Sequence, residues 1–89
     1  MKQAKTIQWD FDACEDYLYW QSYDKKSLKR INQLIKDIIR NPFDGIGKPE
    51  LLKKNLAGLW SRRIDDEHRI VYIIESDVII ILSCRGHYN

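Results

Sequence analysis

The fold is decided by the stretch from Leu59 to Cys84, LWSRRIDDEHRIVYIIESDVIIILSC. Residues 59–64 mix apolar and polar side chains, residues 68–75 are rich in β-branched side chains, and residues 78–84 are almost entirely apolar. Each pattern favours a β-strand, and the two short polar groups between them favour turns. Three successive strands joined by short turns predict an antiparallel β-meander.

Upstream of the meander, the sequence predicts a short strand and then a helix. Polar and apolar residues alternate from Lys5 to Trp9, as they do in a short strand. Asp10 and Asp12 are both good helix N-caps, and we expect the helix to run to about Tyr23. The residues expected on its apolar face are Phe11, Cys14, Tyr17 and Leu18.

A second predicted helix is the most regular element of the sequence. Asp24 can cap it, and Asn41-Pro42 ends it because proline disfavours the α conformation in the residue before it. Between these ends, apolar residues recur at helical spacing, at Leu28, Ile31, Leu34, Ile35, Ile38 and Ile39. The connection that follows, 44–49, contains two glycines but lacks the third glycine of a dinucleotide-binding loop.

The order strand, helix, helix and three strands predicts an α+β fold. We expect the helices to pack on one face of a twisted antiparallel sheet and to leave the other face free to bind a partner. The 89 residues suffice for one domain, spanning residues 1–89, and are too few for two.

Composition narrows the classes of function. The chain is 44% hydrophobic and 31% charged, as a compact globular protein is, and its net charge of +2 identifies no partner by itself. Cys14 and Cys84 lack the spacing of a disulfide framework or metal site, so we expect two reduced, largely buried thiols and no cofactor. With no signal-peptide pattern and no run of about 20 apolar residues, the sequence predicts a cytoplasmic protein without membrane contact.

Basic side chains concentrate on the predicted strands. The cations and histidines of this region are Arg62, Arg63, Arg69, Arg85, His68 and His87. Strand alternation places Arg62 with Trp60 and Ile64, and places Arg63 on the opposite face. Arginine binds phosphate well, but exposed arginines are also the ordinary surface of small domains, so solvation of the sheet remains an alternative.

Glu50 and His87 add a proton acceptor and a proton donor to these cations. Glu50 lies among Lys48, Lys53 and Lys54, whose charges favour its ionised form. Histidine can donate a proton near neutral pH. The sequence has no cluster of metal ligands. A glutamate, an arginine and a histidine can together cleave a phosphodiester by general acid–base catalysis. Considered alone, Glu50 could be an ordinary acidic residue of a surface loop, and His87 could be an ordinary surface or packing histidine.

Six ordered segments carry a family pattern. They are DYLYWQ at 16–21, NPF at 41–43, GKPE at 47–50, WSRRI at 60–64, EHRIVY at 67–72 and CRGHY at 84–88. Over the range from about Ile7 to Tyr88, the chain resembles the YoeB (Txe/YoeB) toxins of bacterial type II toxin–antitoxin modules, within the RelE-like superfamily. The resemblance implies a microbial-RNase-like, RelE-like fold. It also implies a ribosome-dependent messenger-RNA endonuclease that needs no metal or other cofactor.

The family's site residues can be placed one by one on this sequence. The resemblance implies that Glu50 is the general base, that Arg69 stabilises the phosphate and that His87 is the general acid. Tyr88 would orient the substrate or support the acid, and Asn89 extends beyond the family's usual final tyrosine. The candidates for binding the RNA backbone are Lys53, Arg63, Arg62 and Lys54.

Partners follow from the same resemblance. They are the 70S ribosome with its messenger RNA and a YefM-like antitoxin, whose acidic, disordered tail would fold onto the arginines Arg62, Arg63 and Arg69. Homodimers are frequent in the family, and aromatic side chains expected at the surface would permit one. These are Trp9, Tyr19 and Trp20.

The same residues are compatible with three alternative functions. A non-catalytic module that binds the ribosome or RNA would use the same cations to grip phosphates. A ParE-like toxin directed at gyrase shares the general fold, although the presence of Glu50 and His87 argues against it. A purely structural interaction protein is the third alternative.

Overall fold

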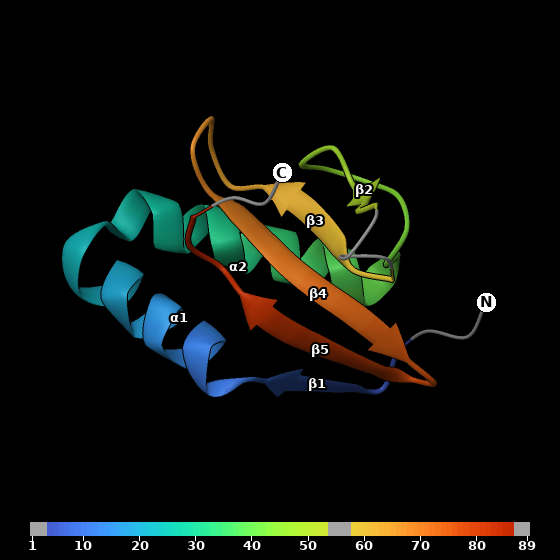
Figure 1. Cartoon of the computed structure of the whole chain (residues 1–89). Coiled ribbons are helices and arrows are strands. Elements are labelled where there is room, and N and C mark those ends of the chain that lie inside the picture. Colours follow the sequence, from blue (N-terminus) through green and yellow to red (C-terminus); the bar gives the residue numbers. More distant parts are fainter. Residues whose placement is uncertain (1–3, 54–57, 87–89) are drawn as a thin grey trace.

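The computed structural model describes residues 4–53 and 58–86 as a sheet with two helices (Figure 1). In chain order the elements are β1 (Thr6–Trp9), α1 (Phe11–Tyr23), α2 (Lys25–Arg40), β2 (Glu50–Leu51), β3 (Trp60–Arg63), β4 (Arg69–Glu75) and β5 (Val78–Ser83). The strands lie in the order β1-β5-β4-β3-β2. The predicted α+β fold is confirmed.

The predicted meander forms as expected, but the sheet as a whole is mixed. β3 and β4 pair antiparallel, as do β4 and β5. β1 instead pairs in parallel with β5, with Thr6 opposite Val78 and Trp9 opposite Ile81. The chain from α1 to β4 lies between β1 and β5, so their connection is much longer than the minimum that two parallel strands require. The two-residue β2, which the sequence pattern does not predict, pairs antiparallel with β3 at the other edge of the sheet.

A bulge between β4 and β5 changes which side chains share a face. Val71 lies opposite Ser83, whereas its neighbour Tyr72 lies opposite Ile81. Ser83 and Ile81 therefore face opposite sides of the sheet, although their spacing of two residues predicts the same side. Ile81 packs with α1 and α2, and Ser83 faces the side away from the main core cluster.

The second helix matches its sequence pattern closely. Asp24 caps α2 by accepting hydrogen bonds from the amides of Lys26 and Ser27, at 3.1 Å each. The helix ends at Arg40, before Asn41-Pro42. Its fully buried residues are Ile31, Leu34 and Ile38, which pack against the sheet in the main core cluster. In Figure 1, α2 runs behind β3 and β4.

The first helix buries a different face from the predicted one. Phe11 and Leu18 are exposed, at 89% and 59% of their surface, while Ala13 and Trp20 are buried. Apolar residues lie on several sides of α1, so their spacing does not select a face. Trp20 is drawn inwards because its indole N–H donates to the Cys84 carbonyl, at 2.7 Å.

The two cysteines also differ from expectation. Both are free thiols, but Cys14 is exposed and only Cys84 is buried. Burial is the main cause that raises the pKa of the Cys84 thiol to about 12, which keeps it neutral at physiological pH. Cys14 follows the outward orientation of Phe11 and Leu18 on the same helix.

Substitutions on the two sides of α1 test this orientation. We expect Trp20→Ala to lower the free energy of unfolding by about 3–5 kcal/mol, because it empties a buried site. Phe11→Ala should change it by no more than about 0.5 kcal/mol, because that side chain is exposed. Urea denaturation followed by circular dichroism measures both values. Equal losses for the two variants would contradict the orientation of α1.

Candidate active site

The sheet face turned away from the helices carries Glu50 and Arg63. Glu50 on β2 lies opposite Ser61 on β3. Cross-strand partners share a face of a sheet, as do residues two apart on one strand. Glu50 therefore shares its face with Arg63, as a diagonal neighbour at roughly 7–8 Å. Both side chains are exposed, so both are accessible to a ligand.

Two arginines face one another on the adjoining strands. Arg63 on β3 lies directly opposite Arg69 on β4. The Arg69 guanidinium donates to the carbonyls of Asp65 and His68, at 3.0 and 3.2 Å. Like charges directly opposite on neighbouring strands destabilise a sheet. A phosphate bound between them would relieve this repulsion, because guanidinium groups match phosphate geometry.

The connection between α2 and β2 holds the backbone before Glu50. The Gly47 carbonyl accepts a 2.6 Å hydrogen bond from the Arg63 amide. Gly47 has φ +79°, and a Cβ there would lie 2.7 Å from the Leu34 side chain, so the position requires glycine. Lys48 also has a positive φ, 52°, which is uncommon for a residue with a side chain and occurs at functionally constrained positions. Packing against α2 and β3 thus sets the path of the chain into Glu50.

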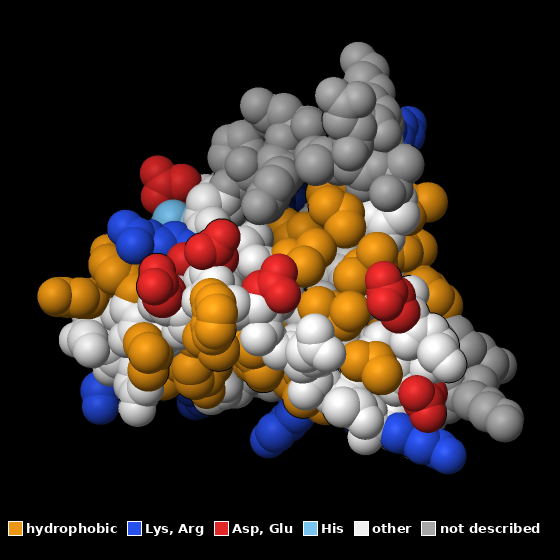
Figure 2. Space-filling view, turned by 60° about the horizontal axis from the view of Figure 1, so that its bottom comes forward, with side chains coloured by type: hydrophobic (Ala, Val, Ile, Leu, Met, Phe, Trp, Pro, Cys, Tyr) orange, Lys and Arg blue, Asp and Glu red, His pale blue; other side chains and the backbone are white. Residues whose placement is uncertain are grey.

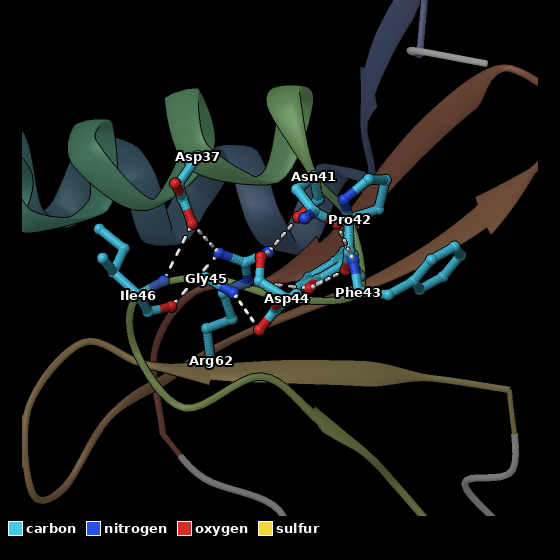
Figure 3. A network of polar contacts seen from close by, with 9 residues as sticks. Asp37, Asn41, Pro42, Phe43, Asp44, Gly45, Ile46 and Arg62 are labelled. Atoms are coloured by element: carbon cyan, nitrogen blue, oxygen red, sulfur yellow. Dashed lines mark hydrogen bonds and ion pairs between the residues drawn. The ribbon is translucent and has the colours of Figure 1, made fainter. Parts of the chain in front are cut away.

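The buried side chain of Arg62 fastens this connection to the core (Figure 3). Its five hydrogen bonds go to the hydroxyl of Tyr72, the carboxylate of Asp37 and the carbonyls of Ile46, Asn41 and Asp44. A guanidinium group has five N–H donors, so the buried charge is fully hydrogen-bonded. The Tyr72 hydroxyl donates in turn to the Pro42 carbonyl, at 2.7 Å.

The burial of Arg62 corrects the expectation that it contacts RNA or an antitoxin. Its side chain has no exposed surface, and its guanidinium binds α2 and the loop that follows. The physical reason lies in the strand alternation, which places Arg62 with Trp60 and Ile64 on the side facing the helices. That alternation is the sequence signal that could have identified Arg62 as a structural residue.

The chain after β5 is also fixed, by α1. The Cys84 amide donates to the Asp16 carboxylate at 3.0 Å, and the Cys84 carbonyl accepts from the Trp20 indole. The Arg85 guanidinium lies over the ring of Tyr19, 3.6 Å from its centroid. Because Trp20 is buried in this role, the expectation of an exposed Trp20 at a dimer surface is wrong.

The remaining predicted site residues are only partly described. Lys53 is exposed after β2. Lys54, His87 and Tyr88 lie outside the described residues. Gly86, the residue before His87, has its carbonyl hydrogen-bonded by the Arg69 amide at 2.8 Å. The chain is thus fixed next to Arg69 one residue before His87.

A second surface feature lies away from these charges. Trp9, Cys14, Tyr17 and Leu18 line an open, largely apolar pocket where β1 meets α1. Figure 2 shows hydrophobic side chains gathered on one face of the molecule, with acidic side chains among them. Exposed apolar surface of this kind often marks a protein contact.

Among residues 4–53 and 58–86, no group of three potential metal ligands comes together. Neither helix of this part of the chain has the length and apolar character needed to cross a bilayer.

Residues 9–88 match the profile of the YoeB-like toxins of bacterial type II toxin–antitoxin systems. The chain belongs to this family. Toxin YoeB of Escherichia coli K12 is 56% identical over 80 residues, which cover 90% of this chain and 95% of the relative. Toxin YoeB of Synechocystis is 66% identical over 74 residues, covering 83% of this chain and 86% of the relative.

Solved structures of YoeB toxins share the fold. The YoeB dimer of Staphylococcus aureus superposes with a TM-score of 0.87 at 50% identity, over 98% of this chain and all of that one. A heterotetrameric YoeB–YefM toxin–antitoxin complex of the same organism gives a TM-score of 0.85 at 50% identity, with the same coverage. The chain is therefore a YoeB-like toxin of a type II toxin–antitoxin system.

The Asp37–Arg62 pair makes the stability of this toxin depend on pH. The Ile46 amide, followed by the Arg62 guanidinium, holds the pKa of Asp37 below its ordinary value of 3.8. A pKa lowered by folding contributes stability above the unfolded value, and this stability is lost as the pH falls through the folded value.

We therefore expect Asp37→Asn to lower the free energy of unfolding by about 1–3 kcal/mol at pH 7. The difference from the native chain should shrink as the pH falls below 3.8. Urea denaturation at pH 7 and near pH 3 measures it, with the exposed Asp66→Asn as control. A difference that grows towards acid pH would refute the assignment.

Proposed function

We propose that this YoeB-like toxin is a ribosome-dependent messenger-RNA endoribonuclease. The observation that carries the proposal is the position of Glu50, a carboxylate on the same open sheet face as the facing arginines Arg63 and Arg69. This arrangement supplies a base beside a phosphate-binding pair. Family membership supports it, because the resemblance implies the same activity.

The proposed reaction is an internal attack within the RNA. Glu50 removes the proton from a ribose 2′-OH, and that oxygen attacks the adjacent phosphorus. Arg69 and Arg63 stabilise the negative charge that develops on the phosphoryl oxygens. His87 gives a proton to the departing 5′-oxygen as the P–O5′ bond breaks, which leaves a 2′,3′-cyclic phosphate. Tyr88 supports the substrate or the acid, and the RNA backbone contacts Lys53 and Lys54.

Substrate alignment is the contribution proposed for the ribosome. The nucleophile and the scissile bond belong to the same strand, so the reaction is fast only when the 2′-oxygen, the phosphorus and the leaving oxygen are in line. Correct orientation of reacting groups supplies as much as about 7–11 kcal/mol in intramolecular reactions. Messenger RNA held in the ribosomal A site would arrive already ordered, which is the reason we propose weak activity on free RNA.

The proposed protein partners are a YefM-like antitoxin and a second copy of the chain. An acidic antitoxin tail would bind over Arg63 and Arg69, neutralising the facing charges. The assemblies named for the Staphylococcus aureus toxin, a YoeB dimer and a YoeB–YefM complex, support both partners. We further propose that residues 1–89 form a single toxin domain that acts in the cytoplasm.

Glu50→Gln tests the nuclease directly. It removes the base while keeping the size and hydrogen-bonding capacity of the side chain. We expect single-turnover cleavage of ribosome-bound messenger to fall by at least about 10²-fold. Glu75→Gln, an exposed carboxylate at the far end of β4, is the matched control and should cleave at the native rate. Primer extension on a translated messenger, with and without ribosomes, reads both variants.

The same variants separate the alternative functions. If Glu50→Gln stops translation as strongly as the native chain, a non-catalytic ribosome- or RNA-binding module explains the protein better. Inhibition of DNA supercoiling by purified gyrase would favour the ParE-like alternative. Thermal unfolding of each variant shows that loss of cleavage does not come from loss of the fold.

A further inference from the structure

His68 lies immediately before β4, which begins at Arg69. Its ring Nδ1 accepts a hydrogen bond from the Gly86 amide, at 2.8 Å. The ring packs edge-on against Trp20 of α1, with the centroids 4.8 Å apart. Family resemblance assigns no role to His68, and the reaction proposed above does not use it.

The protonation state of the ring follows from this contact. An imidazole nitrogen that accepts a hydrogen bond carries no proton, so the neutral ring bears its hydrogen on Nε2. Nε2 lies 3.3 Å from the Glu67 carboxylate, which can accept that hydrogen. The two neighbours therefore select one tautomer and one ring orientation.

His68 is itself held firmly enough to act as a support. Its amide donates to the Asp65 carboxylate at 2.7 Å, and its carbonyl accepts from the Ile64 amide at 2.9 Å. Its side chain is 19% exposed, so the hydrogen bond to Gly86 is largely shielded from competing water. The ring is fixed by the turn before β4 on one side and by Trp20 on the other.

Gly86 is consequently held from both sides. The His68 ring binds its N–H, and the Arg69 amide binds its carbonyl, each at 2.8 Å. A residue held through both of its peptide groups has little freedom to rotate. The next residue in the chain is His87. The support therefore acts one peptide away from the proposed general acid.

We propose that His68 is a positioning residue: its neutral ring holds the Gly86 amide and thereby sets the direction in which the chain presents His87 to the phosphate beside Arg69. The inference rests on the proposed nuclease activity, and it assigns His68 no direct contact with RNA. Proton transfer to the leaving oxygen depends steeply on donor placement, so loss of the support lowers the rate of the chemical step.

Two near-isosteric substitutions isolate the hydrogen bond. His68→Asn places an amide oxygen near the position of Nδ1 and can still accept from the Gly86 amide. His68→Leu has a similar shape but no acceptor. We expect His68→Leu to lower single-turnover cleavage on saturating ribosomes by about 10- to 100-fold. His68→Asn should stay within about threefold of the native rate, and ribosome binding should be the same for all three proteins.

A second measurement reads the contact without any reaction. In ¹H–¹⁵N spectra, the Gly86 amide should be protected from hydrogen exchange in the native chain and in His68→Asn, and should lose this protection in His68→Leu. Thermal unfolding and the amide signals of α2 show whether each variant keeps its fold. If His68→Leu fails to fold, it is replaced by His68→Gln, whose acceptor sits farther out and should fail to keep the native rate.

The outcomes separate the two proposals. If the native chain cleaves messenger and His68→Leu cleaves equally well, or if Asn and Leu are equally impaired in folded proteins, the positioning role is wrong. If Gly86 is unprotected in the native chain, the contact itself is wrong. If the native chain protects Gly86 but cleaves no translated messenger, the nuclease proposal fails, and the positioning role fails with it.

Discussion

The structure depends on a buried positive charge. The guanidinium of Arg62 is enclosed by α2, the connection after it and β4, where an unpaired charge would be prohibitively costly. Every partner that compensates this charge is consequently held in one place. Asp37 supplies the negative charge, and the backbone carbonyls from Asn41 to Ile46 supply the remaining acceptors. One side chain therefore shapes a loop that has little apolar content of its own.

The loop that binds Arg62 also leads into the candidate active site. The chain leaves the Arg62 network at Ile46, passes Gly47 and Lys48 in backbone conformations with positive φ, and enters β2 at Glu50. Arg62 and Arg63 are neighbours in sequence but lie on opposite faces of β3. Arg62 organises the interior, and Arg63 is exposed on the same face as Glu50. Strand alternation thus gives adjacent arginines separate tasks.

Much of the fold could be predicted because its signals are local. The meander, the extent of α2 and its Asp24 cap follow from spacing and from side chains that bond to their own segment. The buried face of α1 could not be predicted in this way, because its apolar residues point in several directions. Trp20 is the buried aromatic residue of α1 because its indole binds the carbonyl of Cys84, which is 64 residues away in the chain. The bulge opposite Val71 and Tyr72 likewise arises from pairing between two strands, and no single strand encodes it visibly.

The sequence by itself determined the family, the α+β class, and the residue types that a phosphodiester-cleaving site requires. These depend on the identity and order of residues, which the chain carries without folding. Only the tertiary structure decided that Arg63 lies opposite Arg69, and that Asp16, Trp20 and His68 hold the segment from Cys84 to Gly86. Those facts depend on contacts between distant segments, where burial of a charge and pairing of each polar group select one arrangement among many that the local patterns allow.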